Sequence, residues 1–176
     1  MLVTAAETDR LTLRPLDADD GPFVVALLND PSFVQFVGDK KLRTLQDAHE
    51  YIRSGARDGY SRRALYLAAR RKDGERIGMC SLIKREGLDD VDLGFAVLAR
   101  FRGCGYATEA AAWTMACARD VHGLERLVAV TTPDNVASGR VLEKLGFTFV
   151  RMIRLHAGAR ELKVFESIGR SPADGV

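Results

Sequence analysis

The stretch Arg100–Ala110, which reads RFRGCGYATEA, joins an apolar run to a long helical pattern. Two glycines, Gly103 and Gly105, stand one residue apart where that helix should begin. Glycine destabilises a helix unless the backbone needs a left-handed turn or the close approach of another group. The first N–H groups of a helix lack intrahelical partners and carry partial positive charge. The stretch is therefore typical of a strand–turn–helix unit that binds phosphate.

Three kinds of phosphate-binding turn fit this unit to different degrees. The dinucleotide fingerprint needs a third glycine where Thr108 stands, and the P-loop needs a Gly-Lys-Ser/Thr ending that this sequence does not contain. The pyrophosphate loop of acyl-CoA-dependent acetyltransferases follows Arg/Gln-x-x-Gly-x-Gly/Ala, which Arg102, Gly105 and Ala107 match. We interpret residues 102–108 as a pyrophosphate loop, and a plain strand–helix turn is the alternative.

The residues around the loop predict a mixed α/β (α+β) domain. Alternating or continuous apolar runs predict strands, and a 3.6-residue period predicts helices. The expected strands are 10–14, 64–69, 77–83, 91–97, 127–132, 147–150 and 160–168. The expected helices are 23–28, 44 to either 55 or 59, 106–122 and 135–145. Asn29–Pro31 is interpreted as a break after the first helix. We expect a single, largely antiparallel seven-stranded sheet flanked by about four helices, with a right-handed parallel crossover from Val91 to Thr132.

Composition limits the class of protein. The chain has 176 residues with 26 basic and 24 acidic side chains, a formal net charge of +2. We expect a single domain over residues 1–170 and a flexible tail at 171–176. The charge balance argues against a nucleic-acid partner, and the short apolar runs argue against a membrane partner. Three scattered cysteines without metal-ligand spacing, and a start unlike a signal peptide, predict a cytoplasmic protein with no metal.

Four stretches, one of them within the opening loop, carry a resemblance to a known family. They are Thr8–Arg14, Asp92–Phe95, Gly103–Ala110 and Asn135–Phe147. In this order and spacing they resemble the GNAT superfamily of N-acetyltransferases, and within it the RimJ/RimL branch that acetylates ribosomal-protein N-termini. Each stretch is a weak signal alone, but together they span most of the chain. The resemblance implies the GNAT fold, with acetyl-CoA as co-substrate and no metal.

The resemblance also implies roles for the strand and the loop. In this family the strand before the loop separates from its parallel neighbour, and the pantetheine arm hydrogen-bonds to it like an added chain. That assigns Phe95, Ala96 and Val97 to the pantetheine. The pyrophosphate would bind the loop, which consists of Arg102, Gly103, Cys104, Gly105, Tyr106, Ala107 and Thr108. Asn135 and Ser138 would lie near the thioester end of the cofactor, as binding and catalytic residues.

Four residues are the catalytic candidates. Attack of an amine on a thioester needs a base for the proton, donors for the oxyanion and an acid for the thiolate. Asp92 is the first candidate base, at a position where the resembled branch often has a glutamate, and Glu161 before the last strand is the second. Ser138 is the candidate donor to the thiolate, because Phe165 stands where other branches have a tyrosine. Asn135 is either a helix cap or a ligand contact.

We therefore expect an acetyl-CoA-dependent N-acetyltransferase that acts on a primary amine by direct attack in a ternary complex. The acceptor is a protein N-terminus or a small-molecule amine such as an aminoglycoside, a polyamine or a free amino acid. The resembled branch often forms dimers, so the resemblance allows a homodimer, and the sequence leaves the oligomeric state open. The alternative is a catalytically inactive acyl-CoA-binding or regulatory module, since Phe165 and Asp92 depart from the family pattern. Thr108 disfavours a nucleotide-binding oxidoreductase.

Overall fold

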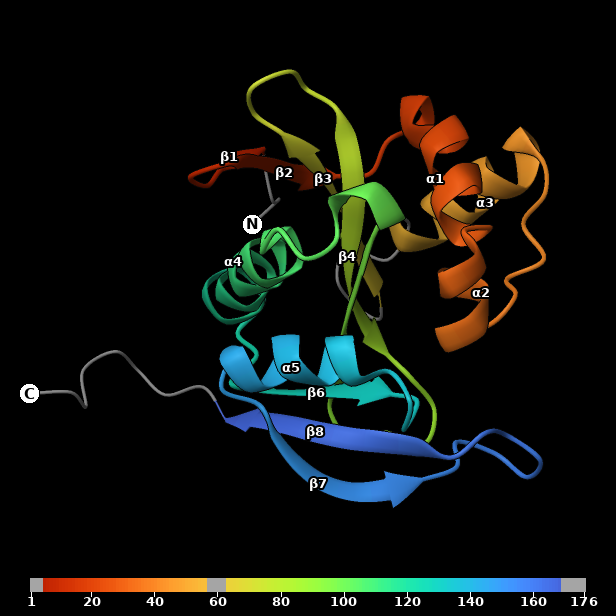
Figure 1. The fold of residues 1–176 in the computed structure, drawn as a ribbon, viewed down its shortest axis with the longest axis vertical. Coiled ribbons are helices and arrows are strands. Elements are labelled where there is room, and N and C mark those ends of the chain that lie inside the picture. The colour runs from red at the N-terminus through yellow and green to blue at the C-terminus, as the bar shows by residue number, and fades with distance from the viewer. Residues whose placement is uncertain (1–4, 57–62, 169–176) are drawn as a thin grey trace, which may run out of the picture.

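A computed structural model describes residues 5–56 and 63–168 of the chain. Its single mixed sheet has the strand order β1-β2-β3-β4-β5-β6-β8-β7. The strands are β1 (Ala6–Glu7), β2 (Leu11–Pro15), β3 (Arg63–Arg70), β4 (Arg76–Lys84), β5 (Val91–Val97), β6 (Arg126–Thr131), β7 (Thr148–Ile153) and β8 (Leu162–Ile168). All pairings are antiparallel except that of β5 with β6. The sheet twists strongly, so that β4 runs down Figure 1 while β6 and β8 run across it.

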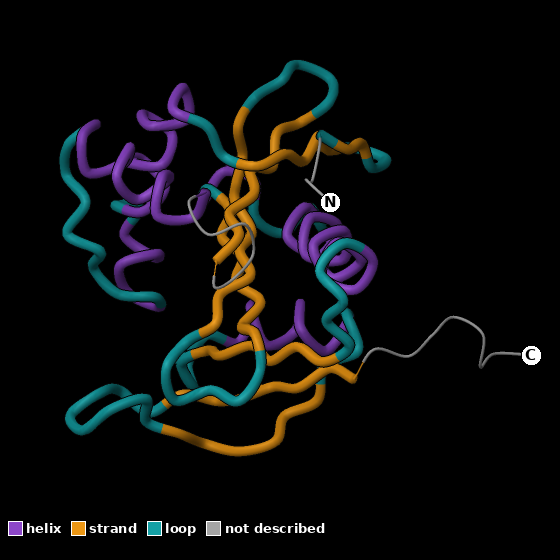
Figure 2. The backbone as a smooth tube through the Cα atoms, turned by 180° about the vertical axis from the view of Figure 1, so that it is seen from behind, coloured by secondary structure: helices purple, strands orange, loops and turns teal. Residues whose placement is uncertain are grey.

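Helices cover both faces of this sheet. Within the described residues they are α1 (Gly21–Leu28), α2 (Pro31–Phe36), α3 (Leu45–Ala56), α4 (Tyr106–Asp120) and α5 (Val136–Lys144), with the 3-10 helices η1 (Ala18–Asp20) and η2 (Ala99–Phe101). Figures 1 and 2 place α1, α2 and α3 on one side of β3 and β4, and α4 on the other. No helix in the described part of the chain has the length and apolar character needed to cross a membrane.

The expected architecture is confirmed, with one strand and one helix added. All seven expected strands are present, and the eighth, β1, is a two-residue pairing with β2. The added helix α2 begins at Pro31, with Asp30 as its N-cap accepting from the N–H of Ser32 at 3.0 Å. The expected break at Asn29–Pro31 is confirmed, since α1 ends at Leu28, but the sequence did not predict the short helix that begins at Pro31, where proline fits the first turn. The expected tail, 171–176, lies outside the described residues.

Strand β3 divides the hydrophobic core in two. Successive side chains of a strand point to opposite faces. Leu65 and Leu67 pack in the cluster beneath α1 and α3, whereas Tyr66 packs in the cluster beneath α4 and α5. The Tyr66 ring meets Trp113 of α4 edge-on, with centroids 5.1 Å apart. Because β3 is buried on both faces, its sequence is a continuous apolar run rather than an alternating one.

The parallel pairing of β5 with β6 is very short. Val91 pairs with Leu127 and Asp92 with Val128, and no other β5–β6 pair occurs in the described residues. Strand β5 continues to Val97 along β4, and β6 continues to Thr131 along β8. The two strands therefore separate after Asp92, as the family resemblance implies. Their separation leaves edge backbone groups of β5 open to another hydrogen-bonding partner.

Asp20 fixes the start of α1 to the sheet. Its fully buried carboxylate accepts from Arg14 Nη1 and Nη2 at 2.8 and 2.9 Å, and from Arg76 Nε at 2.8 Å. The N–H of Asp17 donates to it at 2.9 Å. Burial acts to raise the pKa of Asp20, but these hydrogen bonds lower it more, so the pKa lies below that of an ordinary aspartate. Folding therefore stabilises the ionised form.

We expect Asp20→Asn to destabilise the protein by about 2–4 kcal/mol at pH 7, because two guanidinium groups lose a buried carboxylate. A carboxyl group whose pKa falls on folding contributes stability above its unfolded pKa, and this contribution is lost as pH falls through the folded pKa. Urea denaturation should show the difference between wild type and variant shrinking from pH 7 to pH 3. Asp120→Asn, in an exposed pair with Arg119, is the control and should not change stability. A difference that does not vary with pH would contradict this account.

Candidate functional site

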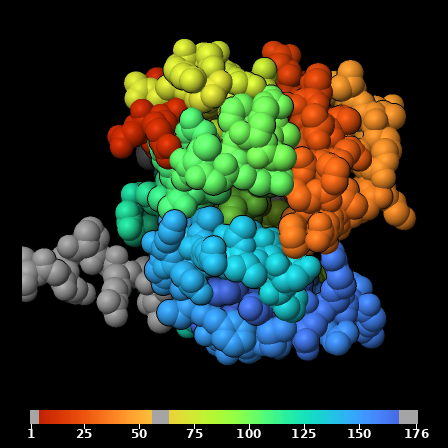
Figure 3. Space-filling model, in the orientation of Figure 1, coloured from red at the N-terminus to blue at the C-terminus, as the bar shows by residue number. Residues whose placement is uncertain are grey.

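A cavity of about 510 Å³ lies where β5 separates from β6. Its walls come from α2 and the segment after it, from β4, β5 and β6, and from the start of α5. Figure 3 shows a hollow between the green segment that holds α4, the cyan segment that holds α5 and the orange segment that holds α2. A volume of this size is typical of small-ligand sites.

Several of the expected site residues meet at this cavity. Those that line it are Asp92, Phe95, Ala96, Asn135 and Ser138. Val97 follows them at the end of β5, and its carbonyl accepts from Arg102 Nε at 3.0 Å. Glu161 is exposed just before β8 and does not line the cavity, although its neighbour Leu162 does. A catalytic role for Glu161 stays a prediction.

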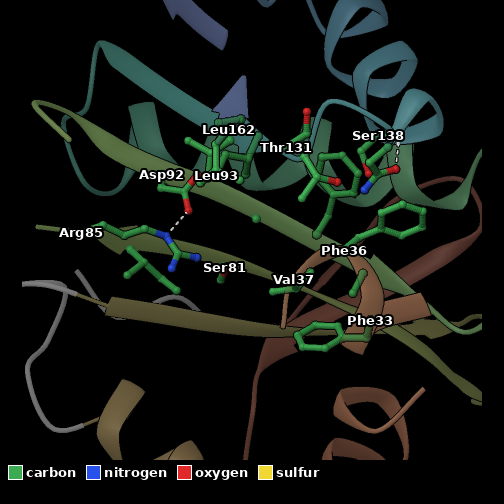
Figure 4. Close-up of a pocket in the computed structure, with 18 of the residues that line it drawn as sticks. Phe33, Phe36, Val37, Ser81, Arg85, Asp92, Leu93, Thr131, Ser138 and Leu162 are labelled. Carbon is green, nitrogen blue, oxygen red and sulfur yellow. Dashed lines mark hydrogen bonds and ion pairs between the residues drawn. The ribbon is translucent and has the colours of Figure 1, made fainter. Parts of the chain in front are cut away.

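Asp92 combines burial with access to the cavity. Its side chain is 3% exposed, and its Oδ2 accepts from Arg85 Nε at 2.5 Å (Figure 4). Burial raises the pKa of Asp92 above its usual range, although the charge of Arg85 opposes the shift. Oδ1 makes no hydrogen bond of normal geometry with the described residues, although the backbone N–H of Val130 lies close enough to the carboxyl group to oppose the rise in its pKa. A buried carboxylate with a raised pKa and an open acceptor atom is suited to take a proton.

Two threonines at the end of β6 add buried polar atoms that also lack a hydrogen-bond partner. The hydroxyls of Thr131 and Thr132 are buried and make no hydrogen bond with described residues, and both residues line the cavity. Buried polar atoms in native proteins nearly always have partners, which include bound ligands and water. Three such atoms in one cavity, counting Asp92 Oδ1, point to a ligand that supplies the missing hydrogen bonds.

The start of α5 also faces the cavity. Asn135 caps this helix, because its side chain accepts from the N–H of Ser138 at 3.2 Å. The hydroxyl of Ser138 makes no hydrogen bond within the described part of the chain, and Figure 4 places it on the α5 side of the cavity. The positive end of the α5 dipole stabilises negative charge that develops nearby. Asn135 is thus a helix cap at the cavity wall.

The loop before α4 has the backbone that a phosphate turn needs. Gly103 and Gly105 have φ of +72° and +80°, in the left-handed region. Gly105 is the N-cap of α4, so no side chain caps the first N–H groups of this helix. Those groups belong to Tyr106, Ala107 and Thr108, the first turn of α4. The exposed loop and uncapped helix start are therefore compatible with a bound pyrophosphate.

Glu109 fixes this loop from the helix side. Its carboxylate accepts from Thr8 Oγ1 at 2.7 Å, and from the backbone N–H and Nε of Arg10 at 2.8 and 2.7 Å. Arg10 Nη1 then donates to the carbonyl of Cys104 at 2.8 Å, and its guanidinium lies 4.6 Å from the centre of the Tyr106 ring. Burial acts to raise the pKa of Glu109, but these hydrogen bonds lower it. The N-terminal stretch of the chain thereby holds the loop in shape.

Arg102 connects the loop to the acceptor side of the cavity. Its Nη2 donates to Asp30 Oδ1 at 3.0 Å, and Asp30 is the N-cap of α2. Its Nε donates to the carbonyl of Val97. The guanidinium thus lies along β5 toward α2. The role of Arg102 at the pyrophosphate stays a prediction.

Sequence reasoning did not assign roles to Arg10, Glu109 or Arg85 in this site. Glu109 lies in the first turn of α4, where an acidic residue already favours the helix start, so its type alone does not indicate a contact with the N-terminal stretch. The Thr8–Arg14 stretch carried the resemblance, and that was the signal that could have linked it to the loop. Arg85 stands in a polar turn segment without any motif, so only the folded structure brings it to Asp92.

Comparisons with known proteins agree with this geometry. The sequence profile of the acetyltransferase (GNAT) domain matches residues 10–148. The chain belongs to the GNAT acetyltransferase family. It is therefore an acyltransferase enzyme.

Two relatives come from Bacillus subtilis. The uncharacterized protein YkkB is 29% identical over 156 residues, which cover 86% of this chain and 89% of YkkB. The uncharacterized N-acetyltransferase YoaA is 26% identical over 145 residues, which cover 80% of this chain and 81% of YoaA. Among solved structures, RimL, a ribosomal L7/L12 alpha-N-protein acetyltransferase in complex with coenzyme A, has a TM-score of 0.79 at 18% identity. The alignment covers 92% of this chain and 95% of RimL, and it confirms the GNAT fold.

We expect Gly105→Val to abolish acetyl-CoA binding while the fold survives. A Cβ at Gly105 would lie 3.2 Å from Arg10 Nη2, so the branched side chain would displace the guanidinium that holds the loop where we expect the pyrophosphate. The matched control is Gly123→Val beyond the other end of α4, because Gly123 also has a positive φ of +65°. Both variants carry the same kind of backbone strain. Calorimetric titration should show binding only to the control, and unchanged affinity in Gly105→Val would refute the loop assignment.

Proposed function

We propose that this enzyme transfers the acetyl group of acetyl-CoA to a primary amine by direct attack in a ternary complex. One observation carries the proposal: three buried, unpartnered polar atoms gather in the cavity that opens where β5 leaves β6. They belong to Asp92, Thr131 and Thr132. The cavity thus offers a proton acceptor and two hydroxyls to a ligand, next to a strand edge that lacks a neighbour.

Acetyl-CoA binds at two places, the gap between β5 and β6 and the loop before α4. The pantetheine arm lies along Phe95–Val97, where the backbone of β5 has no partner from β6. The pyrophosphate binds the backbone N–H groups of residues 102–108. The bound coenzyme A in the RimL structure, which shares this fold, supports the assignment. Asn135 and Ser138 at the start of α5 lie near the thioester.

The residues of the cavity supply each element of the transfer. The amine nitrogen forms a bond to the acetyl carbon, and the carbon–sulfur bond breaks. Asp92 takes the proton of the amine, directly or through one water molecule. The thiol leaves with a proton that the hydroxyl of Ser138 helps to deliver, and the N-terminus of α5 stabilises the charge on sulfur. No covalent enzyme intermediate is needed, so the exposed Cys104 has no nucleophilic role.

Two classes of acceptor fit this scheme. RimL is named for acetylation of ribosomal L7/L12, so a protein N-terminus is one class. A small-molecule amine is the other. Both present a primary amine, and both need Asp92 to be ionised before the proton is removed.

We expect Asp92→Asn to lower kcat roughly 10²–10⁴-fold, the usual contribution of a general base. A base works only when ionised, so the wild-type rate should fall as pH drops through the pKa of Asp92, which burial raises above the ordinary aspartate range. The part of this acid limb that Asp92 sets should be absent from the variant, which keeps only the part set by ionisation of the amine itself. Rates of CoA release with saturating substrates from pH 5 to pH 9 provide the measurement. Equal kcat values for variant and wild type would exclude Asp92 as the base.

Glu161→Gln is the matched comparison, because Glu161 is the exposed second candidate. It should keep both the rate and the acid limb. Calorimetric titration with acetyl-CoA should give saturable binding for the wild type and both variants. Absence of saturable binding to the wild-type protein at micromolar concentrations would refute the proposed function itself.

A further inference from the structure

The residues that line the cavity carry more positive than negative charge. Among the described residues that line it, Lys40 and Arg85 are basic and Asp92 is acidic. The charge of Lys40 is close enough to Asp92 to lower its pKa. Extra cationic groups on an acceptor would meet repulsion here, which disfavours polyamines and aminoglycosides. An acceptor with a negative group of its own would be attracted.

Arg85 has donors to offer such a negative group. Only its Nε contacts Asp92, and its Nη1 and Nη2 make no hydrogen bond with the described residues. The side chain is 30% exposed and lines the cavity, and Figure 4 shows it beside Asp92. The terminal fork of a guanidinium matches the two oxygens of a carboxylate. Arg85 can therefore hold an acceptor carboxylate while it remains bound to Asp92.

The unpartnered Oδ1 of Asp92 and the terminal nitrogens of Arg85 belong to neighbouring side chains. Asp92 Oδ1 needs a hydrogen-bond donor, and the Arg85 fork needs an acceptor. Their side chains are joined by a 2.5 Å contact between Nε and Oδ2. A ligand that satisfies both must carry an amine and a carboxylate close together. An α-amino acid has these groups on a single carbon atom.

Apolar side chains make up much of the remaining lining, which also holds the polar Tyr51 and Ser81. The apolar residues from α2, the segment after it and the region before β8 are Phe33, Phe36, Val37, Leu155 and Leu162. Figure 4 shows Phe33, Phe36 and Val37 together on the α2 side. Such walls favour an apolar side chain on the acceptor, because they remove its surface from water.

A hydrogen bond joins the two segments that carry these walls. Arg160 Nη1, between β7 and β8, donates to the carbonyl of Gln35 in α2 at 2.7 Å. Figure 3 shows the blue C-terminal segment beside the orange segment that holds α2. The contact holds the cavity-lining residues of α2 close to those next to β8.

We infer that the acceptor is a free α-amino acid with an apolar side chain, whose carboxylate binds Arg85 and whose amine donates to Asp92. This inference rests on the proposed function and narrows its acceptor to one class. In the transfer, the amine nitrogen bonds to the acetyl carbon, the thiol of CoA leaves, and the amine proton passes to Asp92. The product is an N-acetyl amino acid that keeps its carboxylate on Arg85.

The test measures CoA release with leucine and phenylalanine, their amides, and a tripeptide that begins with leucine. We expect kcat/KM for each free acid to exceed that for its amide about tenfold or more, the size expected for hydrogen bonds to a charged group. The amide has the less basic amine and carries less proton at a given pH, so amine ionisation cannot produce this preference. Amides or the tripeptide reacting as fast as the free acids would overturn the inference and leave the proposed function standing.

Arg85→Gln separates recognition of the carboxylate from support of Asp92. If Arg85 only positions Asp92, the variant slows acid and amide equally, the acid-to-amide ratio stays high, and the inference is overturned. If Arg85 binds the carboxylate, the ratio falls to about one: both substrates lose the support that Arg85 gives to Asp92, but only the acid also loses its carboxylate partner. Arg119→Gln, in an exposed pair on α4, is the control and should keep the wild-type ratio. CoA release with none of these amines, despite acetyl-CoA binding, would refute the proposed function together with the inference.

Discussion

Two backbone pairings, Val91 with Leu127 and Asp92 with Val128, join β5 to β6 in the described residues. Each strand keeps its antiparallel partner on the other side, β4 and β8, so the sheet stays intact while the gap opens. Asp92 stands at the last paired position, where both strands bury it and the cavity begins. The raised pKa of this carboxyl group and its access to a ligand thus have a single geometric cause.

Arginine contacts then set the shape of the surfaces around that gap. Arg10 and Glu109 hold the loop before α4, and Arg102 connects it through Asp30 to α2. A loop that is ordered before its ligand arrives loses less conformational entropy on binding. Arg85 plays a double part, because its charge opposes the upward shift in the pKa of Asp92 and its free donors face the cavity. Arg85 therefore limits the rise in the pKa of Asp92 and, in our inference, binds the carboxylate of the acceptor.

The sequence was sufficient for elements with a strong local signal. The glycines before α4, the cap at Asn135 and the apolar runs of the central strands predicted their elements within a few residues. Helix α2 was missed because Pro31 is locally ambiguous: proline ends one helix and begins the next. Strand β1 was missed because two residues have no period to detect.

The contacts of the site were harder to predict for a different reason. Arg10 and Glu109 are 99 residues apart, and Arg85 reaches Asp92 across the turn between β4 and β5. Such contacts depend on the folded sheet, and propensity and periodicity carry no information about them. The expected residues of β5 and α5 did meet at one cavity, because the resemblance supplied the long-range arrangement that local patterns lack.

A crystal structure of the protein with coenzyme A would test the central claim most directly, that the separation of β5 from β6 forms the cofactor site. The account predicts the pantetheine arm between the two strands, hydrogen-bonded to the backbone of Phe95–Val97, and the pyrophosphate on the N–H groups of residues 102–108. Coenzyme A bound elsewhere, with β5 and β6 paired beyond Asp92, would contradict it.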